Sequence, residues 1–117
     1  GKYRPGEPLP KGARYDDASK TRPAQAALAR GLQQRFLNDR NFGMLAPMEE
    51  YASQAGHTMS ELALAWIASN SAVSSVLVGA SNTEQLDANV KGVEWRLSPE
   101  ESAEVNKILD DTLGLDI

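Results

Sequence analysis

The residues with the clearest capacity for chemistry lie in one short stretch of the chain. Residues 76–78 (Val-Leu-Val) form an apolar run, which predicts a buried parallel strand near residues 74–78. Gly79, Ala80 and Ser81 then form a small turn before the start of a helix. The first N–H groups of a helix lack intrahelical partners and carry partial positive charge, so this arrangement is suited to hold a phosphate.

Four residues of this stretch are candidates for contacts with such a ligand. Gly79 permits close approach of the backbone, and Ser81 can donate its hydroxyl group. Gln85 and Asn89 lie one turn apart on one face of the expected helix. A purely structural interpretation remains open: Ser81 caps the helix, and the side chains of Gln85 and Asn89 are solvated.

Residues 1–23 are rich in glycine, proline and charge, which predicts a long loop. Its basic residues contrast with the acidic remainder of the chain: Lys2, Arg4, Lys11, Arg14, Lys20 and Arg22. The loop is therefore either a solvated connector or a flap that binds an anion.

Helices are expected to position these segments. They are predicted over residues 23–35, from a cap at Asn38 to about Gln54, and after Thr58-Met59-Ser60-Glu61, Ser81-Asn82-Thr83-Glu84 and Ser98-Pro99-Glu100-Glu101. Pro47 predicts a kink, or a helix that begins near it. Apolar spacing predicts three buried faces: Leu45, Met48, Tyr51 and Ala52; Met59, Leu62, Ala63 and Trp66; and Val105, Ile108 and Leu109.

One strand among these helices needs partners, because a lone strand leaves its backbone polar groups unpaired. The chain is therefore expected to be part of a larger α/β domain. Trp66 is interpreted as a packing residue, and His57, the single histidine, as an exposed linker residue without a catalytic partner.

Composition excludes several classes of function. The chain has 117 residues, 41% of them apolar and 24% charged, with a formal net charge of −4 and no cysteine. An acidic chain is a poor nucleic-acid binder, and no apolar run approaches the roughly 18–20 residues that span a bilayer. No metal-binding motif is present. These features predict a soluble, cytoplasmic protein.

Residues 76–89 resemble the last strand and helix of the aldo-keto reductases, in the branch that includes potassium-channel β subunits and their bacterial oxidoreductase relatives. Two further matches support this resemblance. Residues 62–66 (Leu-Ala-Leu-Ala-Trp) are similar to the penultimate barrel helix of that family, and Gly1-Lys2-Tyr3 is similar to the start of a family loop.

The resemblance implies an NADP(H)-dependent reductase of aldehydes and ketones on a (β/α)8 barrel, of which this chain would be the C-terminal part. Residues 1–23 would be a cofactor-covering loop and residues 24–71 helices. Residues 74–90 would be the last strand and the cofactor-binding helix, and residues 98–110 the C-terminal helix. The resemblance also allows a homo-oligomer.

Site residues follow from the resemblance one at a time. Lys2 and Arg14 match positions in the flap over the cofactor phosphates. Gly79, Ser81, Gln85 and Asn89 match positions that hold the adenosine and its 2′-phosphate. Ala88 stands where close relatives often have a glutamate, which leaves the choice between NADP and NAD open. The family's catalytic residues have no match here, so the segment alone is expected to be inactive.

A second hypothesis is a self-standing, mostly helical protein-interaction module without enzymatic activity. The capped helices and the acidic composition support it. It requires residues 72–79 to be a loop or a docked edge strand.

Overall fold

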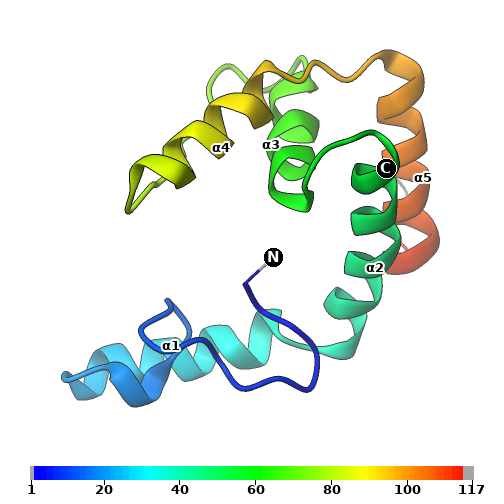
Figure 1. The fold of residues 1–117 in the computed structure, drawn as a ribbon. Coiled ribbons are helices and arrows are strands. Elements are labelled where there is room, and N and C mark those ends of the chain that lie inside the picture. Colours follow the sequence, from blue (N-terminus) through cyan, green and yellow to red (C-terminus); the bar gives the residue numbers. More distant parts are fainter. Residues whose placement is uncertain (1, 115–117) are drawn as a thin grey trace. The chain divides into compact units, whose positions relative to one another are not determined.

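The computed structural model describes residues 2–114, which form five α-helices and one short 3-10 helix (Figure 1). The elements are η1 (Asp17–Ser19), α1 (Pro23–Phe36), α2 (Asp39–Gln54), α3 (Met59–Ser69), α4 (Thr83–Glu94) and α5 (Pro99–Leu113). The chain divides into two compact units, Gly1–Gly43 and Met44–Ile117. Each unit is described by itself.

The strand that the sequence predicts near residues 74–78 is not formed in this structure, so that prediction is corrected here. Residues 75–80 have no regular secondary structure, and no strand occurs anywhere in the part of the chain that is described. Leu77 is 96% exposed and Val78 47% exposed. A strand requires a neighbour for its backbone N–H and C=O groups, and residues 2–114 supply none. The apolar run therefore remains an irregular, exposed segment.

In the first unit, aromatic rings join the N-terminal loop to α1. The Tyr3 ring stacks on Tyr15 with centroids 4.9 Å apart, and Tyr15 stacks on Phe36 at 6.2 Å. The Tyr15 backbone N–H donates to the Tyr3 hydroxyl at 3.2 Å. Residues 2–16 form no helix or strand, as predicted, but η1 interrupts the expected loop and its aromatic residues pack against one another.

The helix starts predicted for α1 and α2 are confirmed. Pro23 opens α1, where a missing N–H costs nothing because the first turn has no acceptor for it. The Asn38 side chain accepts a hydrogen bond from the Asn41 N–H at 3.0 Å ahead of α2. This helix begins well before Pro47 and continues through it, so the alternative of a start near the proline is wrong.

The core of the second unit gathers apolar side chains of α2, α3, α5 and the segment between α4 and α5. Its buried members are Met48, Ala52, Leu62, Ala65, Leu97, Val105 and Leu109. The prediction is wrong for Ala63, which is exposed, because Ala65 lies on the buried side of α3 instead. Trp66 packs against this core, as predicted, and its indole N–H donates to the Asn106 side-chain oxygen at 2.7 Å.

Capping boxes begin α3 and α5, as predicted. The Thr58 hydroxyl accepts from the Glu61 N–H while the Glu61 carboxylate accepts from the Thr58 N–H, and Ser98 and Glu101 do the same. Helix α4 packs against α3 at Gly92, which is buried. A Cβ atom at Gly92 would lie 3.1 Å from the Glu61 Cα atom, so the two helices approach closely there.

Candidate functional site

Helix α4 begins with a turn that its own side chains hold in place. The predicted Ser81 cap is wrong: Asn82 is the N-cap, and its side-chain oxygen accepts from the Gln85 N–H at 2.9 Å. The Gln85 side-chain oxygen reaches back and accepts from the Ser81 N–H at 2.7 Å. Asparagine is at least as favourable an N-cap as serine, so residue type alone does not decide between Ser81 and Asn82.

Asn89 continues this arrangement one helical turn further along α4. Its side-chain amide donates to the Gly79 carbonyl at 3.2 Å. The structure therefore brings together the four residues predicted in this stretch, Gly79, Ser81, Gln85 and Asn89, through hydrogen bonds between the turn and the helix. Both hydrogen bonds are made within the chain and at exposed positions, so the structural interpretation and the ligand-binding one both stay predictions.

The space around Gly79 is open. A Cβ atom placed there would have no heavy atom within 4 Å among the described residues outside its immediate chain neighbours. Packing within this part of the chain therefore does not require a glycine. Within residues 2–114 the turn is open on this side, and the first N–H groups of α4 carry partial positive charge. Glu84 in the first turn partly offsets this positive end.

The two remaining candidates, Lys2 and Arg14, belong to the first unit. Both are exposed. Arg14 lines a pocket with Lys20, Gln25, Leu28, Ala29 and Leu32. Within the described residues, no hydrogen bond or ion pair engages the Arg14 guanidinium. It is thus a cation whose charge is available to a ligand.

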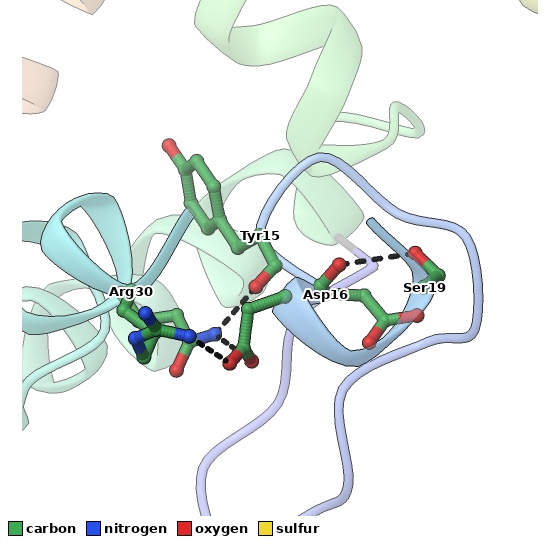
Figure 2. Close-up of polar contacts among 6 residues, drawn as sticks. Tyr15, Asp16, Ser19 and Arg30 are labelled. Atoms are coloured by element: carbon green, nitrogen blue, oxygen red, sulfur yellow. Dashed lines mark hydrogen bonds and ion pairs between the residues drawn. The ribbon is translucent and has the colours of Figure 1, made fainter. Parts of the chain in front are cut away.

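Residues next to Arg14 are engaged in a polar cluster between the loop, η1 and α1 (Figure 2). Gln33 donates its side-chain amide to the Tyr15 carbonyl and, at 2.9 Å, to the Asp17 carboxylate. Arg30 donates to the other Asp17 oxygen at 3.2 Å. The Ser19 hydroxyl donates to the Asp16 carbonyl at 3.0 Å. The sequence analysis missed Gln33, because its partners lie 16 and 18 residues away along the chain.

His57 is not the exposed linker residue that was predicted. Its ring stacks on the Trp95 indole with centroids 3.9 Å apart, and its Nδ1 atom lies 3.0 Å from the Glu61 carboxylate. Glu61 is buried and also accepts from the Thr58 N–H at 3.0 Å. These contacts join the loop before α3 to the end of α4. Among the described residues, the hydrogen bonds of this cluster are made within the second unit.

Acid is expected to destabilise the second unit through Glu61. The hydrogen bond from the Thr58 N–H, with a further contribution from His57, lowers the pKa of the Glu61 carboxyl below its ordinary value of 4.5. A group whose pKa falls on folding stabilises the fold above its unfolded pKa, and this stabilisation is lost as the pH falls through the folded pKa. Glu61→Gln should therefore lose less stability than the unchanged protein when the pH is lowered.

Melting temperatures measured between about pH 6 and about pH 3 test this expectation. Glu94→Gln is the control, because Glu94 is an exposed carboxylate in the same unit. Parallel melting curves for the Glu61→Gln protein and the unchanged protein across this range would contradict the assignment.

Residues 2–114 place no group of three or more His, Cys, Asp and Glu residues where it could hold a metal ion. No helix in that range has both the length and the apolar character that crossing a membrane requires.

Comparisons with known proteins extend this description. Residues 5–110 match the model of a family described as the aldo/keto reductase family. The chain is 40% identical over 88 residues to an L-glyceraldehyde 3-phosphate reductase of Escherichia coli O157:H7, covering 74% of this chain and 25% of that protein. It is 34% identical over 114 residues to a putative voltage-gated potassium channel subunit beta of Schizosaccharomyces pombe, covering 96% of this chain and 30% of that protein. The chain therefore spans between a quarter and a third of the length of these two relatives.

Proposed function

Because this chain belongs to the aldo/keto reductase family, we propose that the whole protein is an NADP(H)-dependent oxidoreductase that reduces aldehydes or ketones. In this proposal the present residues contribute contacts to the cofactor and none of the catalytic groups. The match over residues 5–110 is the observation that carries the proposal. Relatives of this chain include a protein named as a reductase of a phosphorylated aldehyde, which agrees with a carbonyl substrate.

The proposed cofactor contacts agree with the geometry of α4. Gln85 and Asn89 hold residues 79–81 against the start of the helix, so the turn is ordered before a ligand arrives. Gly79 has open space in front of it, and Ser81 is exposed. An ordered, accessible turn at a helix N-terminus suits a phosphate-bearing dinucleotide.

Lys2 and Arg14 are proposed to supply positive charge to the cofactor phosphates, and Arg14 is proposed to contact the 2′-phosphate that NADPH alone carries. A guanidinium binds a phosphate through charge-assisted and often paired hydrogen bonds, which makes Arg14 the stronger candidate. When bound, the nicotinamide supplies the hydride for carbonyl reduction. The residues described here would hold the cofactor and determine its affinity, while the proton donor would come from another part of the protein.

The exposed apolar run also agrees with the proposal. Family membership implies a (β/α)8 barrel, in which each strand is buried between neighbouring strands and helices. We propose that residues 74–78 form a strand in the whole protein, where partner strands pair with their backbone and cover Leu77. The irregular conformation of residues 75–80 is also compatible with the interaction-module hypothesis, which requires residues 72–79 to be a loop or a docked edge strand. The family match favours the enzyme over that alternative.

Arg14→Ala tests the proposed function in the full-length protein. The dissociation constant for NADPH is expected to rise about 10- to 100-fold, because a charge-assisted contact with phosphate is lost. The dissociation constant for NADH is expected to rise less than about threefold, because NADH lacks the 2′-phosphate. Fluorescence titration with each nucleotide measures both values.

Arg22→Ala is the matched control, because Arg22 is an exposed arginine of the same unit that resemblance does not place at the cofactor. Its NADPH affinity should stay close to that of the unchanged protein. Equal losses for NADPH and NADH in Arg14→Ala would contradict the phosphate role. No detectable binding of either nucleotide by the unchanged full-length protein would contradict the proposed function itself.

A further inference from the structure

The carbonyl groups on both sides of Arg14 are held by side chains from other segments of the first unit. The Ala13 carbonyl accepts from the Lys20 ammonium group at 3.0 Å and from the Asp16 N–H at 3.1 Å. The Tyr15 carbonyl accepts from the Gln33 side-chain amide. Arg14 is therefore an exposed cation on a backbone that is fixed immediately before and after it.

The turn that precedes Arg14 is closed by Asp16. The Gly12 N–H donates to the Asp16 carboxylate at 2.7 Å, and this hydrogen bond lowers the pKa of the Asp16 carboxyl. Gly12 has a φ of 76°, a conformation that glycine adopts without strain and other residues rarely adopt. Asp16 is only 8% exposed, so this contact is sheltered from water.

One side chain, Gln33, connects the far side of this loop to α1. Besides the Tyr15 carbonyl, its amide binds Asp17, whose second oxygen accepts from Arg30 (Figure 2). The hydrogen bonds from Gln33 and then Arg30 lower the pKa of the Asp17 carboxyl below its ordinary value. Removing the amide would break the hydrogen bond between the Tyr15 carbonyl and α1 and would leave the Asp17 carboxylate held to that helix by Arg30.

We propose that Gln33 is a positioning residue for Arg14. Gln33 orders residues 15–17, so the Arg14 guanidinium meets a nucleotide phosphate without a further loss of loop entropy. This inference rests on the proposed function. Gln33 itself does not contact the ligand, because its amide is engaged by Tyr15 and Asp17. Ordering a loop before binding raises affinity, because the loop's conformational entropy is then lost on folding and not on binding.

Gln33→Met in the full-length protein tests this role, since methionine keeps the length of the side chain and removes both donors. The dissociation constant for NADPH is expected to rise about tenfold, and that for NADH less than about twofold. Gln34→Met is the matched control. Gln34 is the neighbouring glutamine on α1 and is exposed, so its replacement should leave both constants unchanged.

The double variant Arg14→Ala/Gln33→Met separates positioning from general stability. If Gln33 acts through Arg14, adding Gln33→Met to Arg14→Ala causes no further loss of NADPH affinity. A loss that adds fully to that of Arg14→Ala, with NADH affinity falling equally, would overturn the positioning role.

Asp17→Asn serves as a second variant if Gln33→Met does not fold. It weakens the charged acceptor of Gln33, and we expect a two- to fourfold loss for NADPH. An unchanged NADPH affinity in Asp17→Asn would then overturn the role.

Failure of this inference can be told from failure of the proposed function. If Arg14→Ala weakens NADPH binding and Gln33→Met does not, only the positioning role is wrong. If Arg14→Ala has no effect on NADPH binding, the phosphate role of Arg14 fails, and the inference fails with it.

Discussion

Replacing Gly92 with valine is expected to lower the free energy of unfolding by about 2–3 kcal/mol, because the new side chain overfills the contact between α3 and α4. Even a Cβ atom at this position would lie 3.0 Å from the Leu64 Cβ atom and 3.1 Å from the Glu61 Cα atom. The second of these neighbours is backbone, so it can give way only if a helix moves. Chemical denaturation followed by circular dichroism measures the change.

Gly31→Val is the matched control for this substitution. Gly31 also lies within a helix, but a Cβ atom there would have no heavy atom within 4 Å of it outside its own helix backbone and chain neighbours. Valine at that site should change the free energy of unfolding by less than about 0.5 kcal/mol, since only helix propensity is altered. If the two variants behave alike, the close approach at Gly92 does not limit packing.

Replacing Leu62 with alanine is expected to lower the free energy of unfolding by about 2–5 kcal/mol. Leu62 is 0% exposed and is one of the two largest fully buried side chains in the structure, with Val105. Truncation removes buried methyl groups and leaves a cavity among helices that are joined to one another through this core. Denaturant titrations of both proteins measure the change, since the shift in midpoint gives the difference in the free energy of unfolding when the slope of the transition is the same.

Ile67→Ala provides the comparison within the same helix. Ile67 is 36% exposed, and its replacement by alanine also removes a branched apolar side chain. We expect its free energy of unfolding to change by less than about 1 kcal/mol, because little apolar area is returned to water. Equal destabilisation by the two substitutions would contradict the placement of Leu62 in the core.

Local signals in the sequence were sufficient for most helix boundaries. Thr58 and Ser98 each precede a glutamate by three residues, and this spacing alone predicts the reciprocal hydrogen bonds that begin α3 and α5. Capping depends on atoms within one turn, so tertiary context does not alter it. The error at the start of α4 came from two adjacent caps, Ser81 and Asn82, and only the backbone register decides between them.

The candidate site was predictable in part. The grouping of Gly79, Ser81, Gln85 and Asn89 follows from helical spacing, and the structure adds the hydrogen bonds between them. The partners of Gln33 could not be found in this way. Its contacts with Tyr15 and Asp17 join segments separated by a turn of the chain, and no periodic pattern marks such contacts.

The amino-acid sequence by itself determined the helical segments, the caps of α3 and α5 and the family of this chain, because each depends on residue types at short or ordered spacing. Only the tertiary structure decided that His57 stacks on Trp95, that Gln33 holds the backbone beside Arg14, and that residues 74–78 are irregular. The apolar run satisfies the local requirement for a strand. A strand also needs hydrogen-bond partners from elsewhere, and residues 2–114 do not provide them.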